Sequence, residues 1–345
     1  MSIFFDVQLG FQHFSDDPVT EVAYDNSSAG VLGESLSSWP AGFTPNPGQD
    51  VYGVFVQKVE LDMMKRFGDR TRLRADISFG RAASGSYIDG LVASHAYVAV
   101  RLTDNYNVQL MLGRFGLQPG YEPFRSYDND SLSWSILWRG NLYPPGTTGI
   151  QLSADLTDHF SLYVAAGNGM INDSLSKGNT LPAFISSLVW TWGSDARPNQ
   201  LVVTPWIGPE SGGNRPLTYG GDFTLSLWGS ERWKIGIEGC YQRDNATATG
   251  VNTDYAAGLL NVRYQFLPDW YVLGKYVFAR QFAAGNGALN LTGAKQNIHE
   301  ALVAVGYQLT ESAKLKGEFR FDVVDPASGA SQSTPGAAIS YEWLF

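Results

Sequence analysis

Long stretches of this chain alternate between apolar and polar residues with a period of two. From 314 to 323 the even-numbered positions are Lys, Lys, Glu, Arg and Asp, whereas the odd-numbered positions are apolar or glycine. Residues 70–79 and 232–242 repeat the pattern. Successive side chains of a β-strand point to opposite faces. These segments are therefore predicted to be strands with one face suited to lipid and the other to water.

Similar runs occur along the whole chain and predict about sixteen strands. The expected ranges are 3–14, 51–67, 70–81, 91–103, 105–117, 147–157, 158–168, 184–193, 199–208, 218–229, 231–243, 254–267, 269–282, 297–310, 312–324 and 336–345. Their lengths match or slightly exceed the 9–11 residues with which a tilted strand crosses a bilayer. The alternation is poor over 184–208 and breaks near Arg114, which indicates a bulge or a misplaced boundary. We predict an all-β fold, a transmembrane antiparallel up-and-down β-barrel that forms a single domain over 1–345.

The connections between these strands alternate in length. Tight turns are expected around 68–69, 104–105, 158, 229–231, 268–269 and 310–311. Long polar segments are expected over 15–50, 82–90, 118–146, 169–183, 209–217, 244–253, 283–296 and 325–335. Bacterial outer-membrane barrels have short periplasmic turns and long extracellular loops. We therefore expect both chain ends to lie at the periplasmic rim.

Aromatic residues cluster beside the expected short turns. They are Phe67, Tyr106, Phe160, Trp192, Trp233, Trp270 and Phe345. Aromatic girdles flank the apolar band of transmembrane barrels. Aromatic residues are also common in strands in general. These residues, however, all lie at a similar distance from the rim of short turns, which indicates a girdle.

Composition excludes several other classes. Charged residues make up 17% of the chain, against about 25% in soluble domains. No apolar run reaches the length of about 18 residues that a membrane helix requires. The net charge of −9 argues against nucleic-acid binding. The sequence contains a single cysteine, Cys240, and four dispersed histidines. We therefore expect no disulfide, no metal site and no cofactor.

The first ten residues alternate and have neither a basic region nor an apolar core of the kind found in secretory signals. We interpret the chain as a mature sequence with an added start methionine, from which the signal peptide is absent.

Two segments carry a family motif. The stretch 110–124 reads LMLGRFGLQPGYEPF, and 144–169 reads PPGTTGIQLSADLTDHFSLYVAAGNG. The motif positions are Gly113, Arg114, Phe115, Pro119, Gly120, Glu122, Thr148, Gly149, Ile150, Leu156, Thr157, Asp158, Asn168 and Gly169. They cover about a sixth of the chain and resemble the OmpL-like β-barrel porins, a family of bacterial outer-membrane proteins. The resemblance implies a passive channel for small hydrophilic solutes and ions in a Gram-negative outer membrane.

The chain ends in Phe345, two residues after Trp343. A terminal aromatic residue resembles the signal that the barrel-insertion machinery reads in many outer-membrane proteins. We also expect contact with the lipid bilayer and lipopolysaccharide, and a homotrimer by analogy with other sixteen-stranded porins.

The polar parity of the strands predicts which charges line the pore. Candidate pore-lining residues are Arg70, Arg72, Arg74, Asp76, Arg232, Lys234, Glu238, Lys275, Lys314, Lys316, Glu318, Arg320 and Asp322. About eighteen Lys and Arg lie in the candidate strands against about eleven acids, so the wall is predicted to be mildly basic and weakly selective for anions.

The segment 118–146 is the best candidate for a constriction loop that folds into the lumen, and 15–50 is expected to be an extracellular surface loop. The charged residues of the constriction loop are Glu122, Arg125, Asp128, Asp130 and Arg139. We expect its acids to face wall bases such as Arg72, Arg74, Lys316 and Arg320. A surface loop packed on the rim or on a neighbouring subunit is the alternative.

Other functions remain open at this point. A substrate-selective sugar or anion channel, or a blocked structural or surface-recognition barrel, would share the same strands. An outer-membrane enzyme needs Ser, His and an acid at one height, and Ser94 and His95 alternate to opposite faces. We therefore predict that the protein is not an enzyme.

Overall fold

The structure is a computed structural model. It describes residues 2–13, 50–80, 92–117, 120–123, 128–132, 135, 137, 146–168, 182–209, 218–244, 253–282, 296–326 and 331–344. The loop predicted over 15–50 and the terminal Phe345 lie outside the described residues, except that Asp50 begins a strand.

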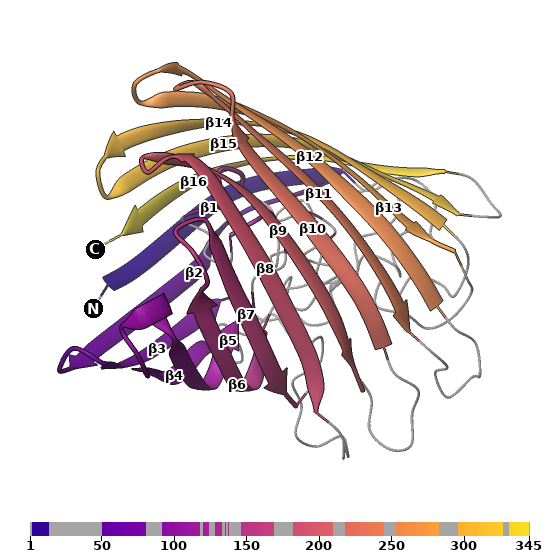
Figure 1. Cartoon of the computed structure of the whole chain (residues 1–345). Helices are drawn as coiled ribbons and strands as arrows, with labels where there is room; N and C mark the ends of the chain where they lie inside the picture. Colours follow the sequence, from indigo (N-terminus) through magenta and orange to yellow (C-terminus); the bar gives the residue numbers. More distant parts are fainter. Residues whose placement is uncertain are drawn as a thin grey trace.

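The described residues form sixteen antiparallel strands, each hydrogen-bonded to its neighbours in the chain, and the last strand pairs with the first to close a barrel (Figure 1). The strands are β1 (Ser2–His13), β2 (Asp50–Phe67), β3 (Thr71–Gly80), β4 (Val92–Arg101), β5 (Gln109–Gly116), β6 (Gly146–Asp155), β7 (Phe160–Gly167), β8 (Ala183–Ser194), β9 (Arg197–Gly208), β10 (Thr218–Trp228), β11 (Trp233–Asp244), β12 (Thr253–Leu267), β13 (Trp270–Gln281), β14 (Gln296–Thr310), β15 (Ala313–Pro326) and β16 (Gln332–Leu344). The predicted up-and-down barrel is confirmed. Among the described residues, no helix is long and apolar enough to span a membrane.

Alternating exposure separates the two faces of the wall. Along β13, Tyr271, Leu273 and Lys275 are buried, whereas Trp270 and Tyr276 are exposed. The exposed face is apolar and the buried face carries most of the charges. This inverted distribution is typical of a barrel with lipid outside and polar groups inside.

β8 shows the same alternation in the region where the sequence pattern is poor. Ile185 and Val189 are buried, whereas Phe184, Leu188 and Trp190 are exposed. Both faces of β8 carry apolar residues, so residue type alone does not separate them there.

The two rims differ as predicted. Both chain ends lie at the rim that carries the short turns (Figure 1). One predicted turn, however, is wrong. The connection at 104–105 is longer, because Tyr106 (φ 58°) and Asn107 (φ 43°) are left-handed within the 3₁₀ segment η2 (Asn105–Asn107), and β5 begins only at Gln109. Left-handed residues interrupt an extended run.

Aromatic rings gather beside the short turns. Phe160 lies 5.9 Å from Trp190, Trp233 lies 4.3 Å from Tyr264, and Trp270 lies 4.4 Å from Tyr307, measured between ring centroids. Several of these rings are exposed on the outer face. Their position fits an interfacial girdle.

The alternation of apolar and polar residues breaks near Arg114, but β5 pairs with β4 and with β6 without a register shift. Arg114 has the outward parity of Leu112, and Phe115 is buried on the inner face. Gly113, which precedes it, has φ +127°, and a Cβ there would collide with the carbonyl of Ala96. This position requires glycine.

Candidate functional site

The described part of the segment 118–146 lies against the inner wall of the barrel and is fastened by wall carboxylates. The backbone amides of Gly120, Tyr121 and Leu132 donate to Asp222 Oδ1 (β10, 3.1 Å), Glu238 Oε2 (β11, 2.7 Å) and Glu318 Oε2 (β15, 2.7 Å). Each of these bonds satisfies a backbone donor of the loop with a side-chain oxygen of the wall. The segment is thus tied at Gly120, Tyr121 and Leu132 to strands far away in the sequence.

Two lysines of the wall fasten the same segment. Lys275 Nζ (β13) lies 2.5 Å from Glu122 Oε1 and donates to Ser131 Oγ at 2.8 Å. Lys316 Nζ (β15) donates to the carbonyl of Asn129 at 2.7 Å and pairs with Glu342 of β16. The other carboxylate oxygen of Glu122 accepts from the amide and the hydroxyl of Ser135.

Asp130 is held by one aromatic and one basic side chain of the wall. Its carbonyl accepts from Tyr271 Oη at 2.8 Å, and its carboxylate lies 3.3 Å from Arg263 Nε. The guanidinium of Arg263 also lies 4.5 Å from the ring centroid of Tyr271. The acids of the segment therefore face Lys275 and Arg263, whereas Arg74 and Arg320, which we expected to face them, pair with acids of the wall.

The ring of Tyr121 rests on the backbone of Gly236 in β11. A Cβ at Gly236 would collide with ring atoms of Tyr121. The ammonium of Lys234, two residues earlier, lies 5.3 Å from the same ring centroid. Burial raises the pKa of the Tyr121 hydroxyl above its ordinary value, so the phenol stays protonated.

Gly236→Ala is expected to lower the urea midpoint of unfolding in lipid vesicles by the equivalent of about 1–3 kcal/mol, because overpacking forces the Tyr121 ring off the wall. Gly274→Ala is the matched control, since a Cβ at Gly274 meets nothing within 4 Å. Equal midpoints for the two variants would contradict the contact between Tyr121 and Gly236.

A second ionic cluster lies on the wall itself. Arg320 Nη2 lies 3.0 Å from Glu300 of β14 and 2.7 Å from Asp322. All three residues are buried. The predicted inward parity of Arg320 and Asp322 agrees with this placement.

Arginines gather at the short-turn mouth. A cavity of about 350 Å³ is lined there by Arg66, Arg70, Arg72 and Arg101, among other residues. Arg70 pairs with Asp104 at 3.2 Å. This group faces the channel on the side of β2–β4.

Farther along β3, Arg74 Nε pairs with Asp62 at 3.1 Å, and Arg74 Nη2 lies 3.3 Å from Asp76. The Asp76 carboxylate also lies 2.5 Å from His95 Nδ1. These charges satisfy one another within the wall.

The other predicted site residues are placed as follows. Arg232 is exposed in the turn before β11, Lys314 is partly buried on β15, and Asp128 is exposed on the described part of the loop. Arg125 and Arg139 lie outside the described residues. Within the described part of the chain, no group of three His, Cys, Asp or Glu side chains has the arrangement of a metal site.

Several residues of the site were missed by the sequence analysis. They are Tyr121, Asn129, Ser131, Asp222, Asn261, Arg263, Tyr271, Glu300 and Glu342. Asp222, Glu300 and Glu342 share the inward parity of their strands, so the alternation contained a signal for them. Nothing local marks Asn129 or Ser131, since their partners lie more than 140 residues away.

Comparisons with known proteins agree with the barrel. Residues 60–341 match the family model described as "Putative beta-barrel porin-2, OmpL-like". A search of curated proteins found no match.

Three solved structures of low sequence identity illustrate the shared fold. The outer membrane channel DcaP of Acinetobacter baumannii is 14% identical with a TM-score of 0.65, and the match covers 99% of this chain and 96% of that chain. OprB of Pseudomonas putida is 10% identical with a TM-score of 0.66, covering 99% and 94%. An anion-selective porin from Comamonas acidovorans is 12% identical with a TM-score of 0.63, covering 100% of both chains. At these identities the likeness shows the fold alone.

Proposed function

The chain belongs to the OmpL-like beta-barrel porin family, and from that premise we propose how its channel is built and used. The protein is a porin of the bacterial outer membrane. Sixteen strands leave an aqueous lumen rather than a packed core. We infer that the chain is a single domain over 1–345 whose channel passes small hydrophilic solutes and ions by passive diffusion.

The segment 118–146 is proposed as the constriction of this channel. The observation that carries the proposal is the set of hydrogen bonds from Gly120, Tyr121 and Leu132 to carboxylates of β10, β11 and β15. A loop tied to the inner wall reduces the cross-section that remains for solutes. The tyrosine and the paired charges of this segment then determine what passes.

Weak anion preference is proposed for the pore. Near the loop the charges are largely paired, whereas Arg66, Arg72 and Arg101 at the short-turn mouth outnumber the acids beside them. Rings of charge set the ion selectivity of a pore. A substrate-selective sugar or anion channel is the alternative, and a porin described as anion-selective shares the fold.

The assembly and partners are also proposals. A trimer form is described for OmpT of Vibrio cholerae, which shares the fold at 11% identity and a TM-score of 0.56. We propose that the protein forms a homotrimer and that lipopolysaccharide surrounds its outer rim. We also propose that the barrel-insertion machinery recognises Phe345 and that the protein has no enzymatic activity. An esterase assay on the folded protein checks the last of these.

Planar-bilayer recording tests the function. Insertion of the purified, folded protein is expected to raise the current in discrete steps, and the channels are expected to close in groups of three. The reversal potential in a salt gradient should be displaced slightly toward the equilibrium potential of the anion. Strong cation selectivity would contradict the role of the arginines. Absence of steps, together with liposomes that do not swell in sugar solutions, would favour a blocked structural or surface-recognition barrel.

A further inference from the structure

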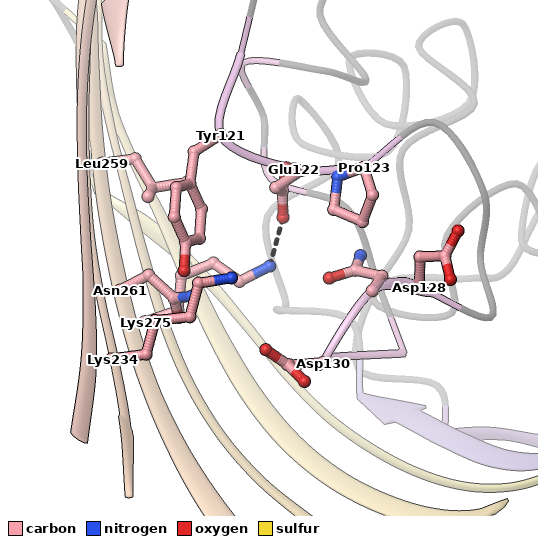
Figure 2. Close-up of a pocket in the computed structure, with 10 residues that line it drawn as sticks. Tyr121, Glu122, Pro123, Asp128, Asp130, Lys234, Leu259, Asn261 and Lys275 are labelled. Atoms are coloured by element: carbon pink, nitrogen blue, oxygen red, sulfur yellow. Dashed lines mark hydrogen bonds and ion pairs between the residues drawn. The ribbon is translucent and has the colours of Figure 1, made fainter. Parts of the chain in front are cut away.

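A cavity lies between the constriction loop and the wall (Figure 2). Its volume is about 140 Å³, roughly ten times what one water molecule requires. The lining residues are Tyr121, Glu122, Pro123, Asp128, Asn129, Asp130, Lys234, Leu259, Asn261 and Lys275. It therefore has room for several water molecules or for one small solute.

Two lysines and three acids line the cavity, and Arg263, which lies outside the lining, offsets the third acid. Lys275 is paired with Glu122 at 2.5 Å, and Asp130 with Arg263 at 3.3 Å. The remaining charges are one ammonium, Lys234, and one carboxylate, Asp128, which have opposite signs. The cavity thus offers no excess charge to a solute of either sign.

Two amides and one hydroxyl of the cavity lining have a buried atom without a hydrogen-bond partner in the described part of the chain; the hydroxyl is that of Tyr121. The amide atoms are Asn261 Oδ1, an acceptor, and Asn129 Nδ2, a donor, in residues that are 4% and 6% exposed. The orientation of the Asn129 amide follows from Ser131, whose backbone N–H and hydroxyl donate to its Oδ1. Buried polar atoms are nearly always paired with protein or with a bound molecule. The cavity therefore presents one neutral acceptor, one neutral donor and the hydroxyl of Tyr121 to its contents.

Apolar surface completes the lining. Leu259, Pro123 and the ring of Tyr121 border the same space. A hydroxyl group both donates and accepts hydrogen bonds, and a small polyol has C–H surface for an aromatic and aliphatic wall. An anion without a hydroxyl group has no proton for Asn261 Oδ1, and an ammonium ion without one has no acceptor for Asn129 Nδ2.

We propose that this cavity is a binding subsite for a small neutral polyol of monosaccharide size. The proposal rests on the porin function, since the subsite lies in the channel and would retain such a solute for a short time on its way through. Water molecules alone are the competing occupant.

Glucose is the probe, and its effect on potassium chloride current through single channels is the measurement. We expect a saturable decrease in current for the wild-type porin. Asn261→Leu and Asn129→Ala should each raise the half-blocking glucose concentration about tenfold, with the block of each variant measured relative to its own open-channel current. Asn297→Ala is the matched control, because Asn297 lies on β14 and does not line the cavity. It should leave the half-blocking concentration unchanged.

Two comparisons show which proposal has failed. If the wild type conducts but glucose has no saturable effect, the cavity holds water only and the subsite proposal is overturned while the porin function stands. Gluconate or glucosamine blocking at lower concentration than glucose would overturn the neutral class. If the wild type does not conduct, the porin proposal fails, and calorimetric titration of the folded protein with glucose, repeated on Asn261→Leu, still tests the subsite. Calorimetric binding that is equal in both proteins, or absent, would overturn it.

Discussion

Lys275→Met is expected to destabilise the folded porin by about 3–5 kcal/mol, which is the cost of leaving a buried charge without its partner. Lys275 and Glu122 are both buried, and Lys275 Nζ lies 2.5 Å from the Glu122 carboxylate. Methionine has a similar length but no charge, so the buried Glu122 carboxylate is left without its cationic partner. The measurement is the urea midpoint of unfolding in lipid vesicles, checked by the electrophoretic mobility of the folded barrel.

The double variant Lys275→Met with Glu122→Gln should recover most of that loss, because a neutral amide has a far smaller desolvation cost than a carboxylate. The amide oxygen that replaces the carboxylate can still accept from the backbone N–H of Ser135, as Glu122 does. Lys234→Met is the matched control and should cost less than about 1 kcal/mol, since Lys234 is only partly buried and contacts the rings of Tyr121 and Trp228. A Lys275→Met variant as stable as Lys234→Met would show that the ion pair does not fasten the loop.

Deleting residues 124–136 is expected to raise single-channel conductance on the order of twofold, because it removes the part of the loop that narrows the lumen. The deletion takes away Leu132 and Asn129, which contact Glu318 and Lys316 on β15. The rest of the loop stays fastened at Gly120 and Tyr121. The measurement is planar-bilayer conductance in potassium chloride.

An equal-length deletion within the segment 15–50, residues 27–39, is the control. We interpret that segment as a surface loop, so the conductance should be unchanged. Unchanged conductance after deletion of 124–136 would mean that the segment does not restrict the current. Reduced folding of that variant, seen by electrophoretic mobility, is separated from the effect on conductance by recording only inserted channels.

The barrel itself could be predicted because its signal is local. Each alternating run, such as 314–323, specifies a strand and both of its faces, and the lengths of the connections specify which rim each turn occupies. The prediction was less accurate where local signals conflict. At β8 both faces are apolar, and at Tyr106 and Asn107 the backbone leaves the extended region despite strand-forming neighbours.

The inward parity of Lys275, Lys316 and Glu318 was also readable from the sequence. Their partners were not, because Glu122 lies 153 residues from Lys275 and Leu132 lies 186 residues from Glu318. Several of the loop's bonds also use backbone amides, which every residue but proline has and which leave no mark in the sequence.

The sequence by itself determined that the chain forms a sixteen-stranded barrel with an apolar outer face, since a period of two acts within each strand. Only the tertiary structure decided which wall strands hold the loop and that Asn129 and Asn261 line the same cavity. The physical reason is that closure of the barrel sets the distance between its strands. A charged side chain on one strand pairs with a group that the curvature of the wall places close to it. The spacing of residues along the chain does not encode the distance between such groups.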